Sequence, residues 1–378
     1  MPKVYNWQIG REMDYPFEEA RPERQFAMIM DTNKCIACQT CTVACKTTWT
    51  PGRGQEYMFW QNVETKPYGF YPLGWDVRIL EKLGVQDMTG PVYEGRTLIE
   101  AAPDGEQVLG YMPADEDWAH PNIGEDDSFS QDEWIEFGAY LTSPHAQWMY
   151  YLPRICNHCS YPGCLASCPR QSIYKRQEDG IVLNDLQRCR GYRECVKGCP
   201  YKKTYFNPMT RVTEKCIGCY PAIENRRQTQ CTITCIGKIR LQGFISRHDA
   251  IDEDNPLDYL IHVCKIAKPL YPQFGLEANV YYIPPVHVPP RYLTQMFGWG
   301  VAEAIELYRT AAEDRRLLGA LLLFGATEEI IERFTVRGDD AIGFSRDGAE
   351  LARVPIREPI HVRAAYDDRL DVHRTNVT

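Results

Sequence analysis

The sequence predicts an α+β fold, with two compact cysteine-rich domains, a long insertion and a C-terminal extension of helices and a β-hairpin. Three observations support this prediction. Fifteen of the sixteen cysteines fall into four tight groups. Hairpin patterns, in which a glycine turn separates short apolar runs, lie between two of the groups and near the C-terminus. Apolar residues at three- and four-residue spacing, which indicates helices, appear after residue 290.

Composition and charge exclude several classes of protein. The 378 residues and 43.6 kDa are enough for about two to three domains. With 42 basic and 51 acidic side chains the net charge is −9, which argues against nucleic acid as a partner. Met1–Gly10 lacks the pattern of a secretory signal, and the longest apolar run, Leu317–Phe324, is too short to cross a bilayer. We therefore expect a soluble chain that reaches a membrane only through partners.

The cysteine spacing is typical of iron–sulfur proteins. The first group has the spacing C-x2-C-x2-C-x3-C, which is that of bacterial ferredoxins. In those proteins a loop supplies three thiolates to one cluster, and the fourth cysteine ligates the other cluster. A large chain without a secretory signal is not a small disulfide scaffold, so the spacing favours metal ligation. The groups are Cys35, Cys38, Cys41 and Cys45; Cys156, Cys159, Cys164 and Cys168; Cys189, Cys195 and Cys199; and Cys216, Cys219, Cys231 and Cys235.

The groups are expected to pair into two bacterial-ferredoxin-like, two-cluster domains. Groups two and three both end in Cys-Pro and are separated by a hairpin pattern, Ile173–Asp185, which turns at Glu178-Asp179-Gly180. Groups one and four share the pattern Lys-Cys-Ile-small-Cys and would pair across the insertion. The crossed assignment gives cluster one Cys35, Cys38, Cys41 and Cys235; cluster two Cys45, Cys216, Cys219 and Cys231; cluster three Cys156, Cys159, Cys164 and Cys199; and cluster four Cys168, Cys189 and Cys195.

The fourth cluster is predicted to differ from the others. Group three has the spacing of group one, except that Tyr192 stands at the second cysteine position. A cube that lacks one thiolate tends to lose the corresponding iron. We therefore predict three [4Fe–4S] clusters and one [3Fe–4S] cluster, with a higher potential at the fourth site, since cluster type and charge are main determinants of potential.

Other interpretations of these residues remain open. Cys216–Cys235 alone has the spacing of a zinc site, which would make the chain a zinc-stabilised scaffold without a redox role. Tyr192 could pack against a cluster without redox meaning. Cys264 lies in an apolar run and is expected to be a buried core residue rather than a ligand. The basic residues around group three are either a solvated face or a compensation of cluster charge; they are Arg188, Arg190, Arg193, Lys197, Lys202 and Lys203.

The predicted domains are residues 1–50 with 204–290, which hold clusters one and two, and residues 151–203, which hold clusters three and four. Residues 51–150 form an insertion, too long for a structureless loop. Its acidic stretch, residues 115–136, has nine carboxylates and no lysine or arginine, and is either solvated or a docking surface for a larger subunit. In the extension, residues 291–378, glycines 319 and 325 are expected to interrupt helices, and Asp347-Gly348 indicates a hairpin. We find no catalytic residue set and no flavin or pterin motif, which argues against a self-contained reductase.

Several segments closely resemble the beta subunits of the nitrate reductase and nitrite oxidoreductase group in the dimethyl sulfoxide reductase (molybdopterin oxidoreductase) family. The matching segments cover most of the chain up to about residue 290. The first and third of them look closest to nitrite oxidoreductase and related nitrate reductases. The segments are YNWQIGREMDYP at Tyr5–Pro16, KCIACQTCTVACK at Lys34–Lys46, GQEYMFWQNVETKPYG at Gly54–Gly69, RICNHCSYPGCLASCPRQSIYKR at Arg154–Arg176, CRGYRECVKGCPYKK at Cys189–Lys203 and EKCIGCYPAIE at Glu214–Glu224.

This resemblance implies a function and partners. The chain would transfer electrons between an alpha subunit, with a molybdenum bis-pterin cofactor and one more [4Fe–4S] cluster, and a haem-bearing gamma subunit, a cytochrome or a quinone. Cluster one would lie nearest the alpha subunit and cluster four nearest the haem. Family members often have tryptophan where this chain has Tyr192. The chain would be co-exported to the periplasmic side with the alpha subunit, or remain cytoplasmic. Enzymes for selenate, chlorate or perchlorate, dimethyl sulfide and ethylbenzene share the cysteine plan, so the substrate stays open.

Overall fold

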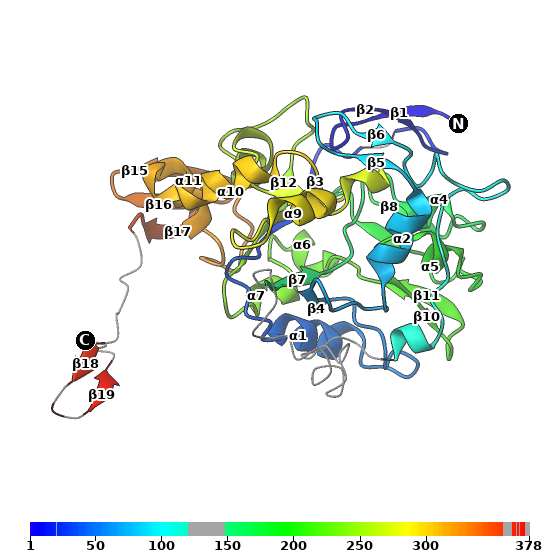
Figure 1. Ribbon diagram of the computed structural model, residues 1–378, viewed down its shortest axis with the longest axis horizontal. Coiled ribbons are helices and arrows are strands. Elements are labelled where there is room, and N and C mark those ends of the chain that lie inside the picture. The colour runs from blue at the N-terminus through cyan, green and yellow to red at the C-terminus, as the bar shows by residue number, and fades with distance from the viewer. Residues whose placement is uncertain (20, 120–147, 358–364, 368, 370, 375–378) are drawn as a thin grey trace, which may run out of the picture.

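The computed structural model describes residues 1–19, 21–119, 148–357, 365–367, 369 and 371–374 (Figure 1). Its strands are β1 (Lys3–Asn6), β2 (Arg11–Asp14), β3 (Gln25–Asp31), β4 (Asn62–Lys66), β5 (Gln86–Asp87), β6 (Glu94–Gly95), β7 (Tyr150–Arg154), β8 (Ile173–Lys175), β9 (Val182–Asn184), β10 (Thr204–Asn207), β11 (Val212–Lys215), β12 (Arg240–Ile245), β13 (Lys268–Pro269), β14 (Val280–Ile283), β15 (Arg333–Arg337), β16 (Asp340–Phe344), β17 (Glu350–Pro355), β18 (Ala365–Asp367) and β19 (Val372–Arg374). Its α-helices are α1 (Thr40–Trp49), α2 (Trp75–Leu83), α4 (Gly163–Ala166), α5 (Glu194–Gly198), α6 (Tyr220–Glu224), α7 (Gln230–Ile233), α8 (Pro256–Asp258), α9 (Pro290–Phe297), α10 (Val301–Arg309) and α11 (Arg315–Leu322). Short turns of other helix types are η1 (Glu116–Trp118), η2 (Tyr259–Val263), η3 (Pro272–Phe274) and η4 (Ala311–Glu313).

A four-stranded sheet with the order β12-β3-β14-β13 organises the fold. Strand β3 pairs antiparallel with β12 and parallel with β14, and all of its residues are buried. Because side chains alternate across a strand, the two faces of β3 enter different cores. Met28 and Met30 belong to the first core, which also takes in the N-terminal segment and the insertion. Ala27 and Ile29 belong to the second core, which takes in the C-terminal extension. The sheet thus separates the later part of the extension, from Ala311 to Ile356, from the body that contains the cysteines.

Short hairpins and short helices flank the cysteine groups. Strands β8 and β9 pair antiparallel between groups two and three, as the sequence predicts. A second hairpin, β10–β11, connects group three to group four. The mixture of short helices with mainly antiparallel strands agrees with the predicted α+β class.

The insertion is anchored to the body at both ends of its described part. Strand β4 pairs with β7, so residues near 62 lie beside residues near 154. Trp75, at the start of α2, is completely buried in the first core. Of the acidic stretch at residues 115–136, only residues 115–119 are described, with η1 among them. The rest of that stretch lies outside the described residues.

The C-terminal extension contains the predicted helices and hairpin, with one error in the helix boundaries. Strands β15, β16 and β17 form an antiparallel sheet, and the β16–β17 turn contains Asp347-Gly348. The prediction that Gly319 interrupts a helix is wrong, since Gly319 lies inside α11. A Cβ atom there would lie 3.0 Å from Val336 Cγ2, so the glycine allows α11 to pack closely on this sheet. The breaks fall at Gly298 and Gly300 and in η4 instead, while Gly325 follows the end of α11 with positive φ. No helix in the described ranges is long and apolar enough to span a bilayer.

Candidate metal centres

The four cysteine loops share one backbone feature. In every group, the residue before the second ligand position has a positive φ angle, a conformation that is uncommon outside glycine. Such a turn folds the loop back on itself and directs successive N–H groups to one side, where they can face an anion. Group three keeps the feature although its second position holds Tyr192. The four residues are Ala37 (51°), His158 (43°), Gly191 (66°) and Gly218 (62°).

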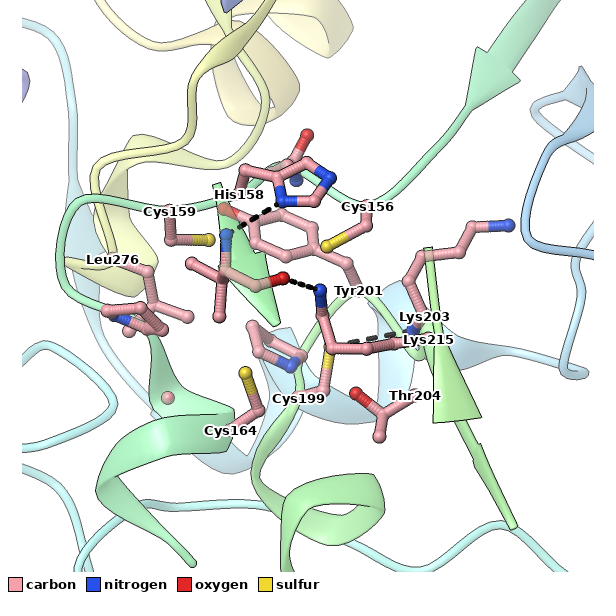
Figure 2. A pocket seen from close by; sticks show the side chains of 15 residues that line it. Cys156, His158, Cys159, Cys164, Cys199, Tyr201, Lys203, Thr204, Lys215 and Leu276 are labelled. Atoms are coloured by element: carbon pink, nitrogen blue, oxygen red, sulfur yellow. Dashed lines mark hydrogen bonds between the residues drawn. The ribbon is translucent and has the colours of Figure 1, made fainter. Parts of the chain in front are cut away.

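The cysteines predicted for cluster three line one cavity. Figure 2 shows the side chains of Cys156, Cys159, Cys164 and Cys199 pointing toward this shared space. They come from the loop after β7, from α4 and from the end of α5. Burial, together with the neighbouring thiols, raises the pKa of Cys159 and of Cys164 well above the usual range. Thiolates at these positions therefore need a cation to balance them, and iron would provide that balance.

The cysteines predicted for cluster two line a second cavity. Cys45, from α1 in group one, joins Cys216, Cys219 and Cys231 of group four, and Trp49 and Trp60 also line the space. The indole Nε1 of Trp49 donates to Cys219 Sγ at 3.2 Å. The last cysteine of group four, Cys235, does not line this cavity. This division argues against the zinc alternative, in which all four cysteines of group four would bind one zinc ion.

The cysteines predicted for cluster one gather beside Cys235. Burial raises the pKa of Cys35 to about 11, and the thiols of Cys41 and Cys235 contribute to the increase. Burial also raises the pKa of Cys41, and the thiol of Cys38 contributes to that increase. Cys38 is the exposed member of the set. Among the described residues, which include all sixteen cysteines, no three side chains are placed to hold a single metal ion. A four-iron cluster takes its ligands from a wider set of sulfurs than one ion does.

Two of the three cysteines predicted for cluster four, Cys168 and Cys189, lie in a more polar setting, whereas burial among apolar side chains raises the pKa of Cys195 to about 12. Ser172 contacts Cys168 Sγ through its hydroxyl at 3.2 Å and donates its backbone N–H at 3.3 Å. Thr213 donates its backbone N–H to Cys189 Sγ at 3.4 Å, and its hydroxyl lies 3.4 Å from Cys195 Sγ. Although burial opposes the effect, these hydrogen bonds hold the pKa values of Cys168 and Cys189 below the usual range. Hydrogen bonds to the sulfur ligands are therefore a feature of this site.

Shared elements connect each cysteine set to the next one. Helix α1 carries Cys41 and Cys45 and packs against α7, so the first two sets adjoin. Cys156 of the third set contributes to the raised pKa of buried Cys216, which places the second and third sets side by side. Helices α4 and α5 pack together and connect the third and fourth sets. Figure 1 shows the α1–α7 pair and the α4–α5 pair in different parts of the molecule.

Comparisons with known proteins indicate iron–sulfur ligation. Residues 147–244 match the family model described as a 4Fe-4S dicluster domain. The chain is 42% identical to the dimethylsulfide dehydrogenase subunit beta of Rhodovulum sulfidophilum, over 76% of this chain and 90% of that protein. It is also 42% identical to the selenate reductase subunit beta of Thauera selenatis, over 71% of this chain and 80% of that one. The respiratory nitrate reductase subunit beta of Haloferax mediterranei is 39% identical, over 75% of this chain and 85% of its own.

The chain belongs to the beta subunits of the dimethyl sulfoxide reductase family. Iron–sulfur clusters fit the residues of this beta subunit, because each predicted set consists of sulfur ligands in a largely buried setting. The buried side chain of Arg240 is also consistent with bound clusters, since two of its donor nitrogens have no hydrogen-bond partner among the described residues. An anionic group beside it would supply what these nitrogens lack.

The structure separates the basic residues around group three into three classes. Lys197 is half-buried and pairs with Glu106 at 2.6 Å. Arg188, Arg190 and Arg193 are exposed, as a solvated face would be. Lys202 and Lys203 are buried, with Lys202 Nζ donating to the carbonyl of Tyr111 at 2.8 Å. Sequence reasoning missed other residues beside the cysteines, namely the half-buried Lys175 and the buried Thr213, Lys215 and Arg240. Adjacency to a cysteine could have indicated Lys215, whereas Arg240 reaches the site only through the pairing of β12 with β3.

Alanine substitutions of Cys164 and Cys264 compare a predicted iron ligand with the one cysteine that is not predicted to bind iron. Cys264 is half-buried against the second core and away from the four sets. We expect Cys164→Ala to lose at least one iron from the third cluster, because only three thiolates remain around that cavity, and Cys264→Ala to keep all bound iron. Iron analysis of the purified variants, with EPR of the reduced proteins, measures both. Equal iron in both variants would contradict the ligand assignment.

Proposed function

We propose that the chain is an electron-transfer subunit that holds four iron–sulfur clusters in a row, three [4Fe–4S] and one [3Fe–4S]. The single observation that carries this proposal is the crossed gathering of the cysteines, in which Cys45 joins the fourth group and Cys235 joins the first. That exchange is the ligation pattern of two-cluster ferredoxins. The chain itself would be non-catalytic and pass electrons between partner subunits.

The two ends of the row support two different partners. Beside exposed Cys38, at the first site, the apolar side chains of Ile36, Val43 and Ile236 are exposed. We propose that a molybdopterin-containing alpha subunit covers this surface and that residues 51–150 also contact it. At the fourth site, Tyr192 is 61% exposed next to exposed Arg193. A haem-bearing gamma subunit, a cytochrome or a quinone would exchange electrons there, and these partners would provide any membrane attachment, on the periplasmic or the cytoplasmic side.

The domain division follows the same pairing. Residues 1–50 with 204–290 would hold the first two clusters, and residues 151–203 would hold the other two. Both units share the first core with the insertion and the beginning of the extension. We therefore expect them to unfold together rather than as separate modules.

We propose nitrite oxidation or nitrate reduction as the reaction of the complex, because the opening segment and the Gly54–Gly69 segment resemble that group. Dimethyl sulfide, selenate or chlorate chemistry is the second candidate, favoured by the 42% identity to those beta subunits. The substrate would bind and react at the alpha subunit, so the test must use the intact complex. Nitrite that reduces the clusters, or nitrate that reoxidises them, supports the first candidate. Activity with dimethyl sulfide, selenate or chlorate alone supports the second.

Low-temperature EPR tests the electron-transfer role itself. The oxidised protein is expected to show a [3Fe–4S] signal, and stepwise reduction is expected to produce the signals of three [4Fe–4S] clusters. The [3Fe–4S] cluster should be reduced at the highest potential, since cluster type and charge are main determinants of potential, and the hydrogen bonds to Cys168 and Cys189 act in the same direction. A colourless, iron-free protein loaded with zinc would contradict the proposal.

A further inference from the structure

Arg240 is a buried cation without a protein counter-charge. Its side chain, at the start of β12, is 1% exposed. Nη1 donates to Gln61 Oε1 at 3.2 Å, whereas Nε and Nη2 have no hydrogen-bond partner among the described residues. A guanidinium stays protonated in proteins, and an isolated buried charge is strongly unfavourable. An anionic group must therefore face Arg240.

The thiols around Arg240 belong to two different cysteine sets. Although burial opposes the charge, the neighbouring thiols raise the pKa of Arg240. Three of them belong to the first set and one to the second. They are Cys35, Cys41, Cys235 and Cys231. The geometry agrees, because β12 packs against α7, which carries Cys231, and Gln61, the hydrogen-bond partner of Arg240, directly follows Trp60 of the second cavity. We therefore place the guanidinium between the first and second sites.

Lys215 occupies the equivalent place between the second and third sites. It is buried at the end of β11, and its Nζ donates to the carbonyl oxygens of Val182 and of Cys216, the latter at 2.8 Å. Figure 2 shows it beside Cys156 and Cys199. Cys156 and Cys164 of the third set and Cys216 of the second all favour its charged form. Like Arg240, it has no carboxylate partner within ion-pair distance in the described part of the chain.

We propose that Arg240 and Lys215 are shared counter-charges, each placed between two consecutive clusters, and that they raise the reduction potentials of the clusters they separate. This inference rests on the proposed function, since it requires the clusters to be bound. Each cluster gains a negative charge on reduction, so a fixed cation nearby stabilises the reduced state. One cation between two clusters stabilises both and weakens the repulsion between them when both are reduced. Arg240 would act on clusters one and two, and Lys215 on clusters two and three.

An EPR-monitored redox titration of the complex as isolated tests the proposal. Arg240→Gln is expected to lower the reduction equilibrium constants of clusters one and two by about tenfold or more, which is about 59 mV for a one-electron couple. The reduction potentials of clusters three and four should shift much less. Lys215→Met should instead lower the reduction potentials of clusters two and three. Arg240→Lys keeps the charge, so its four reduction potentials should remain close to those of the unmodified protein.

A second variant keeps the test decisive if Arg240→Gln fails to assemble. Gln61→Glu preserves the size of a buried side chain that already accepts from Arg240, and it would neutralise the guanidinium within the intact fold. It should lower the potentials of clusters one and two in the same direction. Unchanged potentials in fully loaded Gln61→Glu protein would overturn the inference while leaving the proposed function intact. Absence of iron–sulfur signals from the unmodified protein would instead overturn the proposed function.

Discussion

Replacing Tyr192 by cysteine (Tyr192→Cys) is expected to convert the fourth cluster from [3Fe–4S] to [4Fe–4S]. The backbone already has the geometry of a ligand loop. Gly191 and Arg193 on either side of Tyr192 have positive φ angles, as Ala37 and Gln39 do on either side of Cys38. In each loop the second of these residues directly precedes a helix. Since Tyr192 stands where Cys38 stands, a thiol at position 192 should reach the vacant iron position.

The conversion has three measurable signs. The [3Fe–4S] EPR signal of the oxidised protein should disappear, the iron content should rise by one atom per chain, and the potential of the fourth cluster should fall. Tyr192→Phe is the matched control, because it keeps the ring and supplies no ligand, and it should retain the [3Fe–4S] signal. A [3Fe–4S] signal that persists in Tyr192→Cys after anaerobic, iron-replete purification would contradict this account of the site.

Replacing Arg154 by methionine (Arg154→Met) is expected to destabilise the fold by about 3–5 kcal/mol, the usual cost of removing one partner from a buried ion pair. Arg154 Nε donates to Glu64 at 2.7 Å, and Nη1 donates to the carbonyl of Tyr201 at 2.8 Å. Both charged side chains are buried, and Arg154 also lies over the ring of Trp75. The pair joins β4 and β7 to the segment after group three, so its loss would expose the third site.

The surrounding charges compensate only in part for the loss of Arg154. Lys66 lies 3.3 Å from Glu64 and 2.8 Å from Asp76, so Glu64 would keep one cation after the substitution. Burial alone would raise the pKa of Asp76, but Lys66 and the hydroxyl of Tyr271 hold it below its usual range. Lys66 is therefore already engaged by Asp76 and cannot fully replace the guanidinium of Arg154.

Calorimetry and the rate of cluster bleaching on heating measure the effect. Arg154→Met should lower the unfolding midpoint and accelerate bleaching. Arg247→Met removes the same kind of side chain from an exposed pair with Asp249 and should change neither. An equally stable Arg154→Met protein would show that this ionic cluster does not hold the insertion in place.

The cysteine groups could be recognised from sequence because their spacing is local and chemically specific. The structure brings together in one cavity each the cysteines predicted for clusters two and three, and the β8–β9 hairpin lies where its glycine turn indicated. Helices of the extension were recognised from their periodicity. Gly319 was misread because its role is a close approach between α11 and a sheet that lies later in the chain.

The charges around the sites could not be predicted in the same way. Arg240 stands in a strand whose partners, β3 and the first cysteine loop, are about two hundred residues earlier in the chain. Glu64 and Arg154 likewise meet only because β4 pairs with β7 across the insertion. Burial and ion pairing of such residues are tertiary properties, and an isolated charged residue in a sequence is usually exposed.

Diffraction from crystals of the protein, recorded at the iron absorption edge, would locate each iron and the sulfur atoms bound to it. We expect iron at four positions in a row, with Cys45 Sγ bound to the iron near Cys216 and Cys235 Sγ bound to the iron near Cys35. Iron bound by Cys45 together with its own group, zinc in place of iron, or disulfides among these cysteines would contradict this assignment.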